Sequence, residues 1–258
     1  MAIRKHLYPL LEFDDQKRAV IEPDHEGLDI RFPPKCAFVF LGDYVDEFAR
    51  KHQAKVLAHF ISATKKFPIY QIEHKGETIC LVQAPVGSSP SGQLMDWLIS
   101  YGVREIISTG TCGTLVDWPA GYFIVPNRAL RDEGTSYHYL PASRYVDLHP
   151  LALKAIEETM LAHSLHYQEV MTWTTDGFYR ETPDLVSYRI EEGCQVVEME
   201  CSALAAVAQF RGVIFGQVLY TADSLADIDQ YDQRDWGETV KKYSLDLAMD
   251  CLLSIKEG

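Results

Sequence analysis

The segment from Gln195 to Ser224 constrains the fold most, because it alternates strand-like and helix-like sequence over a short distance. It begins with a β-branched Val-Val pair at 196–197, which favours a strand. Residues 201–211 are rich in helix formers, and Gly212 follows as a typical helix-ending glycine. The apolar run 213–224 then predicts a second strand. Strand, helix and strand in this order are typical of α/β proteins, which bind ligands at the carboxyl ends of their strands.

The same alternation continues along most of the chain, after a polar segment at 1–35 that we interpret as an N-terminal arm. Strands are expected in segments 36–43, 67–87 (two strands around a Lys-Gly turn), 104–115 (ending in a glycine-containing loop), 121–130 and 167–179, and helices in 44–66, 89–103, 149–165 and 236–256. Segment 131–141 reads as a polar loop. The pattern predicts one α/β domain over 36–258, with a mixed central β-sheet flanked by helices.

Composition excludes several classes of protein. The 258-residue chain is 47% hydrophobic and 24% charged, as in folded soluble proteins, and its net charge of −13 argues against nonspecific nucleic-acid binding. No run approaches the roughly 18 apolar residues of a membrane span, and no signal peptide is expected because segment 1–15 has no apolar stretch long enough for one. The six cysteines form no CxxC pair, so buried reduced thiols in a cytoplasmic protein are expected, without a zinc site or a disulfide framework.

Polar residues follow several of the predicted strands. The loop Ser108–Leu115, "STGTCGTL", offers backbone N–H groups and hydroxyls to an anion, although a structural turn is equally compatible with it. Glu198 and Glu200 flank Met199, either in a surface turn or at a ligand site. Three single residues also have two interpretations each. Asp223 is a helix cap or a general acid, and Phe178 is a core residue or a ring that stacks on a ligand. His138 is a surface residue or part of a catalytic group.

Taken in order, "LGD", "STGTCGTL", "RDEGTSYHYLP", "TDGFY", "VVEMECSAL" and "YTADS" resemble the purine nucleoside/uridine phosphorylase family. The resemblance runs from about Cys36 to the C-terminus, and "GTCG" and "VEMEC" are its most specific motifs. It implies cleavage of a nucleoside N-glycosidic bond by phosphate, which would be a co-substrate. It also implies a homo-oligomer and no metal or organic cofactor.

The resemblance assigns roles to individual residues. Met199 would pack on the ribose, Glu200 would accept hydrogen bonds from its hydroxyls, and Glu198 would lie near the sugar. These groups would favour a transition state with oxocarbenium character. Phe178 would stack on the base, and Asp223 would protonate a purine ring nitrogen as the base leaves.

The base itself is left open by the sequence. The presence of Asp223 favours a purine, whereas segment 131–141 is closer to the uridine-type loop. No glutamine–arginine pair for uracil follows Tyr179, so Arg180 and Glu181 are the nearest candidates for contacts with a pyrimidine base.

Phosphate binding departs from the family pattern. Gly42, Thr111 and Ser108 are the candidate phosphate ligands, but Asp46 occupies the position of one phosphate-binding arginine and Ser108 stands in place of a second. Losing two arginines removes strong charge-assisted hydrogen bonds to a dianion. A cation from this subunit or a neighbouring one would have to replace them, with Lys65, Lys66 and Arg131 as candidates, or water would attack instead.

Three hypotheses follow. The chain is a nucleoside phosphorylase with altered phosphate contacts, a phosphate-independent nucleosidase on the same scaffold, or a catalytically inactive nucleoside-binding protein. Retention of Met199, Glu200, Phe178 and Asp223 together argues for a working glycosidic site and against the third hypothesis.

Overall fold

The computed structural model describes residues 3–256. Within this range the strands form one ten-stranded sheet. They are β1 (Lys35–Val39), β2 (Lys55–Ile61), β3 (Lys66–His74), β4 (Glu77–Gln83), β5 (Glu105–Thr114), β6 (Phe123–Asp132), β7 (Tyr145–Asp147), β8 (Tyr167–Thr175), β9 (Cys194–Glu198) and β10 (Ile214–Ser224). The α-helices are α1 (Tyr44–Lys51), α2 (Ser88–Ser100), α3 (Ser136–Tyr139), α4 (Pro150–Ala162), α5 (Pro183–Glu191), α6 (Cys201–Arg211) and α7 (Lys241–Ser254), with 3-10 turns η1 (Pro9–Leu11) and η2 (Phe178–Arg180).

Five strands close part of the sheet into a ring. β10 pairs with both β5 and β6, and β8 and β9 connect β6 back to β5. From β5 the sheet continues outward through β1, β4, β3 and β2. β5 lies parallel to β1 and β10 but antiparallel to β9, so the sheet is mixed. The predicted single α/β domain with a mixed sheet is confirmed.

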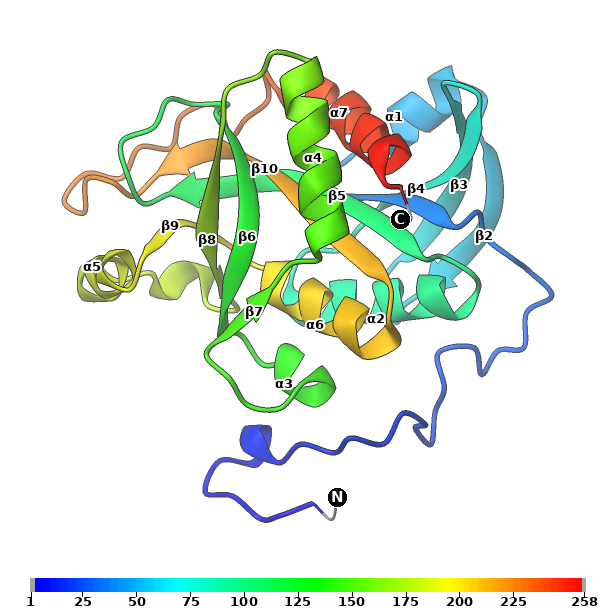
Figure 1. Ribbon diagram of the computed structural model, residues 1–258, viewed down its shortest axis with the longest axis horizontal. Coiled ribbons are helices and arrows are strands. Elements are labelled where there is room, and N and C mark those ends of the chain that lie inside the picture. The colour runs from blue at the N-terminus through cyan, green and yellow to red at the C-terminus, as the bar shows by residue number, and fades with distance from the viewer. Residues whose placement is uncertain (1–2, 257–258) are drawn as a thin grey trace.

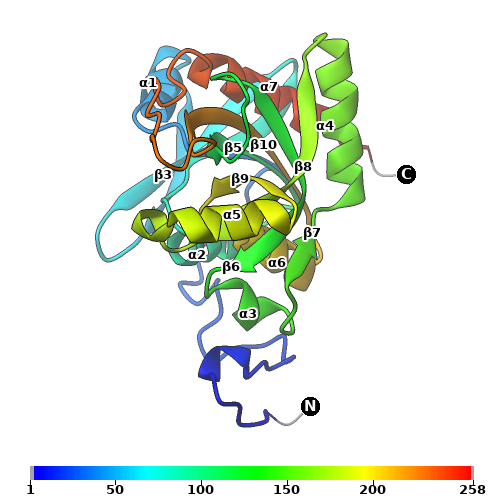
Figure 2. The same ribbon diagram turned by 90° about the vertical axis from the view of Figure 1, so that its left-hand side faces the viewer.

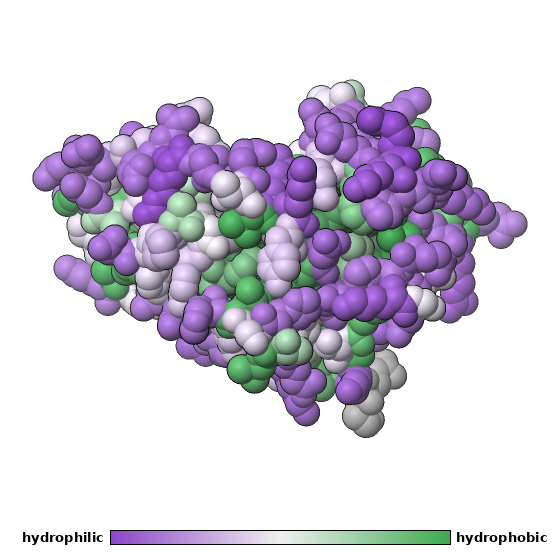
Figure 3. Space-filling model, turned by 90° about the horizontal axis from the view of Figure 1, so that it is seen from above, coloured by the Kyte–Doolittle hydropathy of each residue, from purple (hydrophilic) through white to green (hydrophobic). Residues whose placement is uncertain are grey.

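Helices cover both faces of this sheet, as Figure 1 shows. One hydrophobic cluster joins α2 and α6 to the sheet and includes Leu94, Leu98 and Leu204. A second cluster lies under α4 and α7 and includes Ile156 and Leu252. β10 is buried along nearly its whole length, because a strand with helices on both sides has no solvent face. Seen from above, the surface is mostly hydrophilic, with a smaller group of hydrophobic side chains between two hydrophilic lobes (Figure 3).

The predicted helix over 44–66 is wrong in its second half. α1 ends at Lys51, Gln53 has a φ of +51°, and β2 begins at Lys55. β2 is rich in apolar and β-branched residues and pairs antiparallel with β3, so tertiary pairing overrides the helical spacing. The glycine-containing loop predicted from Ser108 is also mainly strand, because β5 runs through to Thr114.

The N-terminal arm runs below the body of the molecule in Figure 1 and contains only η1 as regular structure between residues 3 and 34. The Lys17 ammonium donates to the Phe210 carbonyl oxygen at 2.8 Å, and the Trp97 indole donates to Glu26 at 3.0 Å. The arm therefore packs against α2 and the end of α6.

All six cysteines are buried and unpaired. Within residues 3–256, no helix has the length and apolar character needed to cross a membrane.

Candidate active site

The residues singled out at the strand ends meet in one inner cavity of about 230 Å³. The strand ring explains this. β5 and β10 run parallel and end together, and β9 pairs antiparallel with the last residues of β5, so the segments after these three strands meet. Figure 2 views the molecule from this side, with α5 and the loop after β10 in front of the sheet. The lining includes Thr111, Phe178, Glu198, Met199, Glu200 and Asp223. Glu200 and Asp223 thus face the same cavity, as the sequence interpretation requires.

Glu200 is held by the start of α2. Gly87, at the N-cap with a φ of +100°, donates its backbone N–H to Glu200 Oε1 at 2.5 Å. Ser88 Oγ donates to the Met199 carbonyl oxygen at 2.7 Å. A helix N-terminus favours a carboxylate, yet burial raises the pKa of Glu200, and the neighbouring charge of Glu198 raises it further. The Glu200 carboxyl is therefore fixed in position and readily protonated.

Glu198 has a structural role as well as a place in the cavity wall. Its Oε2 accepts the backbone N–H groups of Glu200 and Cys201, both at 2.7 Å, at the start of α6. Its Oε1 accepts the Thr174 hydroxyl at 2.5 Å. These bonds occupy both oxygens, so Glu198 orders the Met199–Glu200 turn. Its predicted place near the sugar stays a prediction.

Asp223 precedes the last residue of β10, pairs with Gly113 of β5 and lines the cavity. A Cβ on Gly113 would approach Leu225 Cδ1 to 2.9 Å and Asp223 Oδ1 to 3.3 Å, so a larger residue here would have to displace the Leu225 side chain. Tyr231 donates its hydroxyl to Asp223 Oδ2 at 2.9 Å. Burial raises the pKa of Asp223 although this hydrogen bond partly opposes the shift. A carboxyl with a raised pKa facing a cavity can serve as a general acid.

Glu181 faces Asp223 across the same end of the cavity. Burial raises the pKa of Glu181 to about 7, and the charge of Asp223 contributes. Among the described residues its carboxyl has no hydrogen-bond partner. Sequence analysis named Glu181 together with Arg180 as candidates for contacts with a pyrimidine base, because nothing in the sequence indicates which of two adjacent residues turns inward. Trp236, which also lines the cavity, gave no signal because it lies in an irregular loop.

An outer pocket of about 470 Å³ adjoins the inner cavity. The two share Phe178, Glu181, Asp223 and Trp236 as lining residues. The outer pocket is otherwise bounded by residues of the α5 start and of the loop after β10, namely Tyr179, Pro183, Val186, Leu225, Asp227, Ile228 and Tyr231. The shared residues place the two spaces side by side around Asp223.

Comparison with known proteins identifies the scaffold. Residues 36–250 match the family model described as the phosphorylase superfamily. The chain belongs to this superfamily. A purine nucleoside phosphorylase of the DeoD type from Bacillus cereus is 27% identical over 188 residues, which cover 70% of this chain and 77% of the relative.

Solved structures share the phosphorylase superfamily fold. Uridine phosphorylase from Vibrio fischeri has a TM-score of 0.73 at 21% identity and covers 91% of this chain and 94% of its own. AMP nucleosidase from Bacteroides thetaiotaomicron has a TM-score of 0.71 at 22% identity, covering 88% and 90%. At these identities the likeness establishes the fold, which a phosphorylase and a nucleosidase share.

The side chains that line the inner cavity do not suit the binding of a phosphate anion. Four carboxyl groups line the inner cavity, and no lysine, arginine or histidine among residues 3–256 does so. Of the three predicted phosphate ligands only Thr111 lines it. Ser108 is fully buried, and its Oγ has no partner within the described range. Gly42 is exposed and outside the cavity.

The candidate replacement cations also lie elsewhere. Arg131 is buried, and its guanidinium donates to Ser136 Oγ at 2.8 Å and Ser143 Oγ at 2.6 Å. Lys65 and Lys66 are exposed around the β2–β3 turn and line neither space. Arg180, predicted to contact a base, is exposed and also lies outside both.

The structure does not favour other chemistries suggested by residue type. Cys112 lines the inner cavity, but burial raises its thiol pKa well above the usual value, and the charges of Asp223 and Glu198 add to this. A thiol with so high a pKa is a poor nucleophile. Over residues 3–256, no group of three His, Cys, Asp or Glu side chains is arranged to hold a metal ion. His138 lies outside the inner cavity.

Proposed function

We propose that this chain is a purine nucleosidase, which cleaves the N-glycosidic bond with water as the nucleophile. The observation that carries the proposal is the lining of the inner cavity, with four carboxyl groups and no basic side chain from the described residues. A phosphate dianion would find no charge-assisted partner there, and each carboxyl that ionises would repel it, whereas water needs no cation.

The proposed reaction uses the positions described above. Met199 and Glu200 hold the ribose, and Phe178 stacks on the base. Asp223 gives its proton to a purine ring nitrogen as the bond between that base and C1′ breaks. Water adds to C1′ from the side of Thr111, and its released proton passes to a cavity carboxylate. Carboxylates beside C1′ stabilise the positive charge that develops on the sugar.

A nucleoside phosphorylase is the second candidate. The curated relative named a purine nucleoside phosphorylase favours it, as does the retained Thr111 at the cavity wall. This function needs a cation that the described residues do not supply, for example from a second subunit. The expected homo-oligomer and cytoplasmic location are further proposals, and light scattering of the purified chain tests the first.

Base release from adenosine, inosine, guanosine and uridine, with and without phosphate, separates the candidates. We expect purine release that is independent of phosphate and yields free ribose. A requirement for phosphate and formation of ribose 1-phosphate would establish the phosphorylase instead. Nucleoside binding without release would identify an inactive binding protein. Glu200→Ala, purified in parallel, controls for contaminating enzymes.

A further inference from the structure

We propose that the preferred substrate is a 6-aminopurine nucleoside that carries an apolar substituent on its exocyclic nitrogen, and that the outer pocket holds this substituent. The inference rests on the proposed nucleosidase function and names its substrate class. It starts from the size of the two spaces, since the outer pocket of about 470 Å³ is larger than the inner cavity of about 230 Å³.

The outer pocket opens from the base end of the inner cavity. All four residues that line both spaces belong to this end, which holds the stacking ring of Phe178 and the proton donor Asp223. The predicted ribose contacts Met199 and Glu200 line only the inner cavity. A group in the outer pocket must therefore be attached to the base and not to the sugar.

The walls of the outer pocket suit an apolar group. Ile228, Tyr231 and Trp236 remain 46%, 54% and 41% exposed, and Val186 and Leu225 line the space beside them. Large apolar side chains that gather around an open pocket are typical of a ligand site. Burying an alkyl or benzyl group against them is favourable in proportion to the apolar area removed from water.

The two carboxyl groups at the junction select the position of the substituent. On a purine, the ring nitrogen N7 and the substituent at C6 lie on the same edge. If Asp223 protonates N7, the neighbouring Glu181 lies next to the C6 substituent, and its carboxyl has no partner within the described residues. A secondary amine at C6 keeps one N–H, which can donate to Glu181 while its apolar group points outward. A 6-oxo base lacks such a donor.

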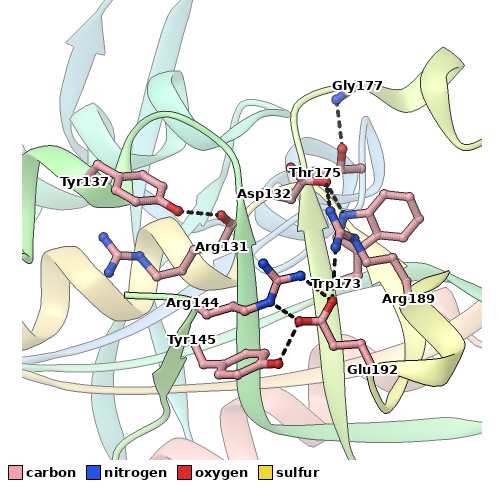
Figure 4. A network of polar contacts seen from close by, with 10 residues as sticks. All are labelled: Arg131, Asp132, Tyr137, Arg144, Tyr145, Trp173, Thr175, Gly177, Arg189 and Glu192. Atoms are coloured by element: carbon pink, nitrogen blue, oxygen red, sulfur yellow. Dashed lines mark hydrogen bonds and ion pairs between the residues drawn. The ribbon is translucent and has the colours of Figure 1, made fainter. Parts of the chain in front are cut away.

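The α5 wall of the pocket is held in place before any ligand binds. Figure 4 shows Arg189 of α5 pointing toward Asp132 and Glu192, and the bonds measure 2.9 and 3.0 Å. Trp173 also donates to Asp132 at 2.9 Å. Because Val186 belongs to the same helix, this network fixes the distance between the pocket wall and the sheet. A preformed pocket binds its ligand with a smaller ordering cost.

The test compares kcat/KM of the full chain for adenosine, inosine and N6-benzyladenosine. We expect the benzyl substrate to exceed adenosine by at least about tenfold, from apolar burial. Ile228→Trp fills the outer pocket from its rim, and the ratio of the two kcat/KM values should fall toward one. Leu161→Trp makes a similar change on α4 at a side chain that is 71% exposed and outside both spaces, and should keep the wild-type ratio.

Equal kcat/KM for adenosine and N6-benzyladenosine would overturn the inference while leaving the nucleosidase proposal intact. An unchanged ratio in Ile228→Trp would overturn it as well. If no nucleoside is cleaved, the proposed function fails, and calorimetric titration with adenine and N6-benzyladenine decides the pocket separately. Tighter binding of the benzyl base, lost in Ile228→Trp, would support the inference, and equal binding would refute it.

Discussion

At the scale of single side chains, burial of carboxyl groups determines both the chemistry and the stability of the inner cavity. Asp223, Glu181, Glu198 and Glu200 all have raised pKa values, first because burial penalises their charged forms. Protonated carboxyls can give protons to a leaving base. The same burial makes ionisation of these carboxyl groups destabilising to the fold. Their protonation state therefore affects both activity and stability.

Asp223→Asn should reduce release of purine bases by about 10²–10⁴-fold, since the amide cannot act as a general acid. Activity of the wild type should also fall as the pH rises through the raised pKa of Asp223, because only the protonated form can donate. Steady-state assays with adenosine from pH 5 to 9 measure both effects. Asp229→Asn, an exposed neighbour, is the matched control. Unchanged kcat in Asp223→Asn would refute the assignment.

Glu200→Gln should raise stability at alkaline pH while abolishing activity. The folded-state pKa of Glu200 lies above the unfolded value of about 4.3, so between these two pKa values the native state holds a proton that the unfolded state has lost. Wild-type stability therefore falls as the pH rises from the unfolded-state pKa to the folded-state pKa. Gln removes this loss and still accepts the N–H of Gly87. We expect Tm at pH 8.5 to rise by roughly 2–4 °C, the shift caused by about 1 kcal/mol, with little change at pH 4. A larger gain at pH 4 than at pH 8.5 would contradict this.

The sequence predicted which residues line the cavity better than it predicted the directions of their side chains. Met199, Glu200 and Phe178 follow recognisable strands and Asp223 lies near the end of another, and the ring of strands brings these residues to one cavity. The inward turn of Glu181 and the hydrogen bonds of Glu198 depend on side-chain directions. Period and composition do not specify these directions.

At the scale of elements, α5 depends on one arginine. Arg189 is 8% exposed and pairs with Asp132 and Glu192, while its guanidinium carbon lies 5.5 Å from the Trp173 ring centroid. Arg144 and Tyr145 bind the same Glu192 carboxylate, so α5 is joined to β7 as well as to β6 and β8 (Figure 4).

Arg189→Met should cost about 3–5 kcal/mol in unfolding free energy, because it leaves a buried ion-pair network without its central cation. Amide hydrogen exchange should quicken most in α5. Urea denaturation and exchange measured by mass spectrometry check both expectations. Arg180→Met, an exposed arginine just before α5, should change stability by less than about 0.5 kcal/mol. A loss spread evenly over the chain, with α5 no more affected, would show that the network does not act on this helix.

Elements with strong local signals were predicted well, and those fixed by tertiary contacts were not. α2, α4 and α6 match expected segments, since each has helical spacing of apolar residues and a recognisable end. The apolar positions of β2 fit a helix as well as a strand, and pairing with β3 decides between them. α5 escaped prediction because it buries only Val186 and Arg189, so the spacing of its apolar residues gives little helical signal.

At the scale of the whole molecule, Asp250 of α7 connects three distant segments. It accepts hydrogen bonds from His74 at 2.7 Å and His163 at 2.9 Å, and Lys75 Nζ lies 2.6 Å away. These contacts link α7 to the β3–β4 turn and to the end of α4. Burial alone would raise the pKa of Asp250, but the hydrogen bonds from Lys75 and His74 outweigh it, and the pKa is lowered.

Asp250→Asn should destabilise the fold by about 1–3 kcal/mol at pH 7. A depressed folded-state pKa contributes stability above the unfolded value of about 3.9, and this contribution is lost as the pH falls through the folded value. The difference between variant and wild type should therefore shrink in acid. Urea unfolding at pH 7 and pH 3 measures it, with the exposed Asp246→Asn on the same helix as control. A constant difference at both pH values would exclude an electrostatic origin.

A pocket lined by four carboxyl groups and by no basic side chain of residues 3–256 offers a 5′-phosphate ester no charge-assisted partner, as it offers none to free phosphate. AMP, ATP and dinucleotides would then be excluded, and the chain would act on a nucleoside only after a phosphatase had removed its phosphate. In a cell, intact nucleotides would then not be cleaved, without any further regulation. Only nucleosides that had already lost their phosphate could enter the cavity.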